Sequence, residues 1–283
     1  MIDISFLHQL DRLSLIINKR VTSNYAGERA SVYTGQGLIF KDYAIYAPGE
    51  DFRKIDWKVF GRTDKLFIKR HEEERNLVIH IIVDYSGSMD FGSGKVTKAE
   101  YAGMLGIGFA YMAMKNNEKF VLSTFADELQ LFRARRGKGQ LAHIVKLLNE
   151  RKPKGASKIE LALARYKKLI QSRSFIVIIS DFLYDPEEIR HAISRFKDHE
   201  VVLVQVLDKV EQELNIEGDY KLVDMESRGV LRTFISPFLR KNYGGMLADH
   251  QAKIRHGCSE IGAKFFTIST DTPIFDAFYK VLS

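Results

Sequence analysis

A run of apolar residues that stops at an aspartate constrains the fold of this chain more than any other feature. Residues 77–83 read LVIHIIV, with His80 as the polar member, and Asp84 follows directly. Continuous apolar runs of this length are typical of strands buried on both faces, as in parallel sheets that helices cover. The next residues, Tyr85-Ser-Gly-Ser-Met89, place two serine hydroxyls on the loop after the carboxylate. We therefore expect a buried strand whose carboxyl end presents several oxygen atoms.

After residue 76, strand-like apolar runs alternate with helical patterns. The strand-like runs lie at 119–125, 174–180, 201–207 and 264–269, and the helical patterns at 97–116, 140–149, 157–171, 186–197, 237–261 and 273–282. This alternation predicts an α/β fold with a doubly wound, mostly parallel sheet.

Two parts of the chain depart from the alternating pattern. Residues 219–236 look like two strands around a polar turn at 226–229, which predicts a hairpin inserted at about 209–236. Residues 1–75 contain one helical pattern and then a Gly- and Tyr-rich extended segment. We therefore expect an N-terminal helix and extended subdomain at 1–75, and the α/β domain at 76–283.

Composition limits the classes of protein to consider. The chain has 283 residues, a net charge of +7 and one cysteine, Cys258, which cannot form an intrachain disulfide. No apolar run reaches the roughly 18 residues that a membrane span needs, and the N-terminus lacks the features of a signal peptide. We therefore expect a soluble, cytoplasmic protein. The basic excess leaves nucleic-acid binding as an alternative, although the 43 basic residues are mixed with 36 acidic ones.

Polar residues follow two of the predicted strands and one loop between helices. Asp84 and Asp181 end strands, Ser86 and Ser88 follow the first, and Ser157 lies beside Gly155 in the loop. The carboxyl ends of parallel strands meet at one edge of a sheet, where ligands bind. Two carboxylates brought together repel unless a cation or a proton lies between them. We therefore predict a Mg²⁺ (or Mn²⁺) site made of these five residues, with one position left for a carboxylate from a partner protein.

The loop from Asp84 to Ser88 resembles the metal-ion-dependent adhesion site of von Willebrand factor A domains. In that family an Asp and two Ser of the first loop bind the metal, and a Thr and a later Asp complete the site. Asp84, Ser86 and Ser88 match the first motif and Asp181 the last, whereas Ser157 stands where Thr is usual. The resemblance implies a von Willebrand factor A-like fold and a role in protein binding.

A second stretch is similar to the signature of domain-of-unknown-function family 58. The matching pieces are Tyr46-Ala-Pro-Gly-Glu-Asp51, Arg53, Ile55-Asp-Trp57 and Arg62-Thr63, with Glu50 where Asp is more frequent and Gly61 where Ala is. This resemblance implies a von Willebrand A-like protein of the kind often paired with MoxR-type AAA+ ATPases. The chain would then be a non-enzymatic, metal-bearing adaptor that has no small-molecule substrate.

Several alternatives remain open from the residues alone. A Mg²⁺-dependent phosphatase also places a strand-end Asp near a second Asp, but Ser86 stands where its general acid is needed. The Asp-x-Ser-x-Ser loop is also compatible with a capped helix start. Arg53, Trp57 and Arg62 are candidate partner-binding residues. We favour a structural interpretation of this stretch, in which Arg53 and Asp56 form an ion pair and Trp57 is a core residue that joins the N-terminal segment to the sheet.

Overall fold

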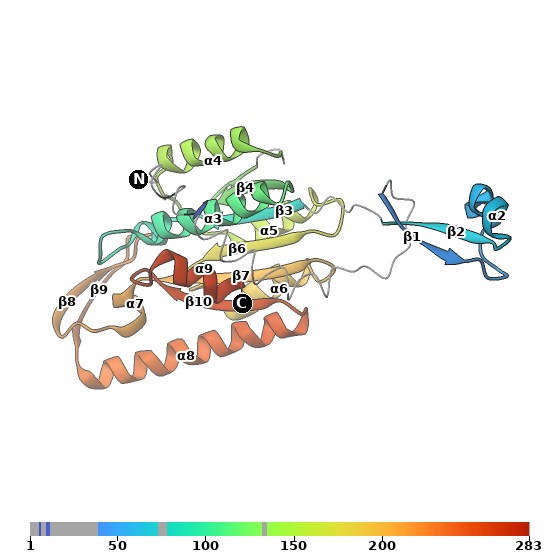
Figure 1. Ribbon diagram of the computed structural model, residues 1–283. Helices are drawn as coiled ribbons and strands as arrows, with labels where there is room; N and C mark the ends of the chain where they lie inside the picture. Colours follow the sequence, from blue (N-terminus) through green and yellow to red (C-terminus); the bar gives the residue numbers. More distant parts are fainter. Residues whose placement is uncertain (1–5, 7–9, 12–38, 73–77, 132–134, 283) are drawn as a thin grey trace. The chain divides into compact units, whose positions relative to one another are not determined.

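The computed structural model describes residues 6, 10–11, 39–72, 78–131 and 135–282. The chain divides into two compact units: Asn18–Asn76, and Met1–Ile17 together with Leu77–Ser283 (Figure 1). The smaller unit therefore begins later than the N-terminal subdomain expected at 1–75, because the first 17 residues group with the larger unit. Of these, Phe6 stacks on Phe275 and Asp11 pairs with Lys115 at 2.7 Å.

The larger unit is built on a six-stranded sheet in the order β10-β7-β6-β3-β4-β5 (Figure 1). The strands are β3 (Val78–Asp84), β4 (Lys119–Phe125), β5 (Leu129–Gln130), β6 (Phe175–Ser180), β7 (Glu200–Leu207) and β10 (Lys264–Ser269). All neighbours pair in parallel except β4 and β5, which are antiparallel. The prediction of an α/β fold with a mostly parallel sheet is confirmed.

Helices lie on both faces of this sheet. They are α3 (Lys98–Lys115), α4 (Lys138–Glu150), α5 (Ile159–Lys167), α6 (Pro186–Ser194), α7 (Lys209–Glu213), α8 (Pro237–Glu260) and α9 (Ile274–Leu282). Ile81 and Val83 of β3 face Gly106 of α3, whereas Ile82 belongs to a buried cluster with residues of α5, α6 and α8. Alternate residues of β3 therefore pack against different helical layers, which explains its nearly continuous apolar sequence.

Helix α3 crosses the sheet beside β3 and begins close to the candidate site. Thr97 accepts a hydrogen bond from the backbone N–H of Glu100, and Glu100 bonds back to the N–H of Thr97, which completes a capping box. A Cβ on Gly108 would lie 1.8 Å from the ring of Phe278 in α9. Glycine is therefore required at this position for the close approach of α9.

The predicted hairpin is present as a separate two-stranded antiparallel sheet, β8 (Gly218–Val223) and β9 (Val230–Ile235). It lies between α7 and α8 in the chain (Figure 1). Within the described residues, no helix is both long enough and apolar enough to cross a membrane.

The smaller unit contains β1 (Ile39–Ile45), a 3-10 turn (Phe52–Lys54), α2 (Trp57–Thr63) and β2 (Phe67–Glu72). Strands β1 and β2 pair antiparallel. The carboxylate of Asp56 caps α2 by accepting from the N–H groups of Lys58 and Val59, and it also accepts from the hydroxyl of Tyr43 at 2.9 Å. The strand pair and the helix are therefore tied together at Asp56, which is buried.

Candidate metal centre at the carboxyl edge of the sheet

Asp84 and Asp181 lie at the carboxyl ends of neighbouring strands. Strand β3 ends at Asp84, β6 ends at Ser180, and the two strands run parallel with Val83 opposite Ile179. Both carboxylates are almost completely buried, at 0% and 1% exposure. The sheet therefore brings together the two acids that the sequence placed at strand ends.

The Asp84 carboxylate accepts hydrogen bonds from several loops. Its Oδ1 accepts from the backbone N–H of Ser86 at 2.9 Å. Its Oδ2 accepts from the hydroxyls of Ser180 at 2.8 Å and Ser157 at 3.3 Å, and from the hydroxyl of Tyr184. Asp84 is thus the residue to which the loops after β3 and β6 and the loop before α5 are joined.

The two serines after Asp84 present their hydroxyls to each other. Ser86 Oγ lies 3.1 Å from Ser88 Oγ. Ser86 occupies the cap position of the 3-10 turn Gly87–Asp90, yet its side chain makes no capping hydrogen bond. Helix capping therefore does not explain the hydroxyl of Ser86.

Ser157 reaches the same site from a second loop. The N–H of Gly87 donates to the carbonyl of Gly155 at 2.8 Å, which joins the two loops through their backbones. The hydroxyl of Tyr184 lies 2.6 Å from Ser157 Oγ. Four of the five predicted residues are therefore linked to one another by hydrogen bonds: Asp84, Ser86, Ser88 and Ser157.

Asp181 has a partner that the sequence analysis did not identify. The ammonium group of Lys98, in the first turn of α3, lies 2.9 Å from Asp181 Oδ2 and 2.7 Å from Glu211 Oε1. The Lys98 side chain is completely buried. A lysine one residue after the cap of a helix with an apolar middle was the available signal in the sequence, because such a charge is buried only with partners.

Burial and neighbouring charges shift the pKa values of these groups. Burial, and then the charge of Asp181, raise the pKa of Asp84 to about 6. Burial lowers the pKa of Lys98, but the carboxylates of Asp181 and Glu211 raise it by more, so that it lies above its usual value. Burial and the two nearby aspartates hold the pKa of Tyr184 well above its usual value, so that its hydroxyl stays a donor.

The oxygen atoms of these side chains are of the kind that could hold a hard divalent cation. Three carboxylates, of Asp84, Asp181 and Glu211, share this site with the single ammonium of Lys98. When ionised, they leave a net negative charge in the protein interior, which is costly without a further cation. Among the described residues, no three His, Cys, Asp or Glu side chains form a metal-binding group. Serine hydroxyls would therefore have to complete the ligand set, and Mg²⁺ accepts such oxygens.

The turn of the β8–β9 hairpin lies against the same loops. The carboxylate of Glu226 accepts from the backbone N–H of Ser157 at 3.1 Å. A Cβ on Gly87 would lie 2.7 Å from the carbonyl oxygen of Met225. The hairpin therefore borders the candidate site, a role that the sequence pattern of the hairpin did not indicate.

A family comparison covers most of the chain and all five predicted metal residues. The model described as "Protein of unknown function DUF58" matches residues 42–253. The chain belongs to this family. The match to DUF58 begins within β1 and ends within α8, so it includes parts of both compact units.

Relatives of this DUF58 chain include uncharacterized proteins of Mycobacterium bovis and Mycobacterium tuberculosis. Each is 27% identical over 267 residues, which covers 93% of this chain and 84% of the relative. Among solved structures, the conserved hypothetical protein BatB of Bacteroides thetaiotaomicron matches with a TM-score of 0.45 and 13% identity, covering 73% of this chain and 97% of that one. An aerotolerance-related membrane protein of Bacteroides fragilis matches with a TM-score of 0.45 and 14% identity, covering 73% and 98%.

The candidate partner-binding residues of the DUF58 signature lie in the smaller unit. Arg53 and Arg62 are exposed, and Trp57 is 61% exposed and makes an edge contact with Phe60. The expectation that Trp57 is a core residue is therefore wrong. The expected Arg53–Asp56 ion pair is also not the one observed, because Arg53 pairs with Asp51 at 3.9 Å and Asp56 caps α2.

Proposed function

We propose that this protein is a non-enzymatic, divalent-metal-dependent protein-binding module and acts as an adaptor of a MoxR-type AAA+ ATPase. The observation that carries the proposal is the hydrogen-bonded group of Asp84, Ser86, Ser88 and Ser157 beside the buried Asp181. The resemblance of this loop to the adhesion site of von Willebrand factor A domains supports the same role. The lone, buried Cys258 is in line with a cytoplasmic protein.

In this proposal Mg²⁺ (or Mn²⁺) would be held by Asp84, Ser86, Ser88, Ser157 and Asp181. When bound, the ion supplies an electrophilic position that an Asp or Glu side chain of the partner can fill. Ser180 and Tyr184 orient the carboxylate of Asp84. Lys98 holds Oδ2 of Asp181, and Oδ1, which accepts a long hydrogen bond of 3.5 Å from the N–H of Leu183, keeps a lone pair for the ion.

A direct test is capture of a purified MoxR-type ATPase by the immobilised protein, with and without a chelator. We expect capture by the wild type only when Mg²⁺ is present, and loss of capture with Asp84→Asn. The matched control is Asp249→Asn, because Asp249 is an exposed aspartate on α8. Equal capture by the wild type and Asp84→Asn, or capture that a chelator does not change, would refute the proposal.

The same variant separates this proposal from the two other classes of protein. A phosphatase would hydrolyse an activated phosphate monoester in the presence of Mg²⁺ and would lose that activity in Asp84→Asn. A nucleic-acid-binding protein would lose affinity steeply as salt rises, whether or not Asp84 is intact. We expect neither behaviour.

A further inference from the structure

The β8–β9 hairpin carries apolar side chains that the described chain leaves exposed. Leu222 and Leu231 lie opposite each other, as do Val223 and Val230, and all four are between 38% and 61% exposed. Phe234, at the other end of β9, is 56% exposed. A two-stranded hairpin is only marginally stable by itself, so an apolar surface of this kind indicates a partner.

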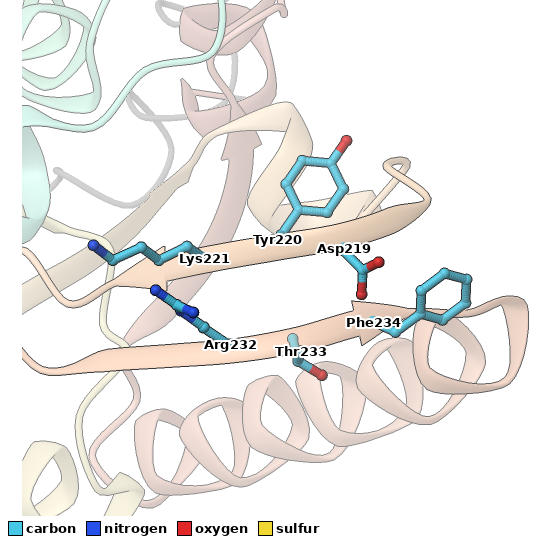
Figure 2. Close-up of a pocket in the computed structure, with 6 residues that line it drawn as sticks. All are labelled: Asp219, Tyr220, Lys221, Arg232, Thr233 and Phe234. Carbon is cyan, nitrogen blue, oxygen red and sulfur yellow. The ribbon is translucent and has the colours of Figure 1, made fainter.

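Two cations occupy the middle of the hairpin. Lys221 lies directly opposite Arg232, and Figure 2 shows both side chains extending toward the same end of the hairpin. Like charges at directly opposed positions of a strand pair are unfavourable. Within the part of the chain that the structure describes, neither side chain has an ion-pair or hydrogen-bond partner. Asp219 lines the same pocket but forms no ion pair with either cation, so the arrangement is suited to an anion that arrives from outside the chain.

The hairpin is continuous with the candidate metal centre. Its turn contacts that centre in two places. The Glu226 carboxylate accepts a hydrogen bond from the N–H of Ser157, and the Met225 carbonyl packs against Gly87. A partner that contacts the strands would therefore also border the metal loops. The turn itself is engaged with these loops, which does not favour its insertion into a lipid surface.

We propose that the hairpin is a second docking surface, one that takes a protein segment in which acidic residues alternate with apolar ones. Successive side chains of a strand point to opposite faces, so Lys221 and Arg232 lie on one face of the hairpin and Leu222 and Leu231 on the other. A segment that pairs as a further strand along this two-stranded sheet places its acidic side chains beside the cations and its apolar side chains beside the leucines. This binding needs no metal, so it stands apart from the metal site.

The probe is a fluorescently labelled peptide in which glutamate alternates with valine, titrated with the full-length protein and followed by anisotropy. We expect binding to the wild type and at least about tenfold weaker binding to Lys221→Glu/Arg232→Glu, because charge reversal makes the carboxylates repel. The control is Arg165→Glu/Lys168→Glu, two exposed cations on or next to α5 that have the same charge change. Leu231→Ser tests the apolar part, with the exposed Leu169→Ser as its control.

Further measurements decide between this docking surface and its alternatives. Binding of the peptide should persist in Asp84→Asn and with a chelator, so that failure of the metal site does not hide this one. A glutamine–valine peptide should not bind. Equal affinity of the wild type and Lys221→Glu/Arg232→Glu would overturn the proposal. It would equally be overturned if these cations affected binding only to phosphatidylserine vesicles or to single-stranded DNA, or if they affected only self-association in sedimentation.

Discussion

Lys98 is the residue whose environment says most about the candidate site. Its ammonium lies in the protein interior between the carboxylates of Asp181 and Glu211. A buried charge is tolerated when it is paired, but removal of one partner leaves the other charges buried and unpaired. The stability of this edge of the sheet therefore depends on Lys98, whatever the site binds.

Replacement of Lys98 should destabilise the protein strongly. We expect Lys98→Met to lower the free energy of unfolding by about 3–5 kcal/mol, because two carboxylates lose their buried counter-ion. Denaturant unfolding at neutral pH measures the change. Lys95→Met is the matched control, because Lys95 is exposed and only three residues away in the chain. Equal stability of the two variants would contradict the role assigned to Lys98.

His80 provides a pH-dependent prediction that is independent of the metal site. Burial, and then the charge of His199, lower the pKa of His80 to about 4, and its Nδ1 lies 2.9 Å from the hydroxyl of Tyr166. The unfolded chain therefore takes up this proton more readily than the folded one. The contribution of His80 to stability is complete above pH 6.5 and decreases as the pH falls toward 4, by about 3 kcal/mol in all.

The measurement is the free energy of unfolding between pH 4 and pH 7 for the wild type and His80→Asn. We expect the wild type to lose more stability than the variant as the pH falls. Comparison of the two proteins cancels groups that titrate in both, such as Asp84. A variant of the exposed His191 should keep the wild-type slope. If His80→Asn shows the same loss of stability with falling pH as the wild type, the prediction is wrong, because His80 then does not stay neutral in the folded protein.

At the scale of elements, the contact between α3 and α9 can be tested with two glycines. Gly108 of α3 is packed against the ring of Phe278, whereas Gly245 of α8 has open space around it. Alanine favours a helix over glycine by up to about 1 kcal/mol. We expect Gly245→Ala to raise the melting temperature, and Gly108→Ala to lower stability by about 1–3 kcal/mol through overpacking. Stabilisation by both substitutions would show that α9 does not approach α3 as closely as described.

The contact of the hairpin turn with the metal loops makes a further prediction. Glu226→Gln weakens the acceptor for the N–H of Ser157, so we expect the hydrogen exchange of this amide to become about tenfold faster. Glu217→Gln, at an exposed position before β8, should leave the exchange unchanged. Unchanged exchange in Glu226→Gln would mean that the turn does not hold this loop.

The sequence predicted the elements more completely than the contacts between them. Apolar runs and the capping residue Thr97 located the five parallel strands of the large sheet and α3 to within a residue or two, because both signals are local. The two short strand-like segments and the polar turn between them also located the hairpin. The position of its turn against Gly87 and Ser157 could not be predicted, because it depends on the path of the chain between β7 and α8.

The same limit applies to the candidate site. The strand-end rule brought Asp84 and Asp181 together because parallel neighbours share one edge of the sheet. Lys98 and Glu211 were missed because Lys98 pairs with Asp181 across 83 residues of chain and with Glu211 across 113. Trp57 was misplaced for a different reason: a large aromatic residue has no local signal that separates a core position from an exposed one.

At the scale of the whole molecule, the chain consists of two compact units, and the two proposed binding regions lie in the larger one. The metal loops and the hairpin are joined through Ser157 and Gly87. Arg53, Trp57 and Arg62 form an exposed set in the smaller unit and remain predicted partner-binding residues.

The central claim is that Asp84 anchors a divalent metal, and calorimetric titration of the full-length protein with Mg²⁺ and Mn²⁺ tests it most directly. We predict one ion bound per chain in the wild type and in the control Asp249→Asn, with a metal-dependent rise in melting temperature. Asp84→Asn should bind the ion at least about tenfold more weakly. Equal binding by the wild type and Asp84→Asn, or no binding by either, would contradict the account.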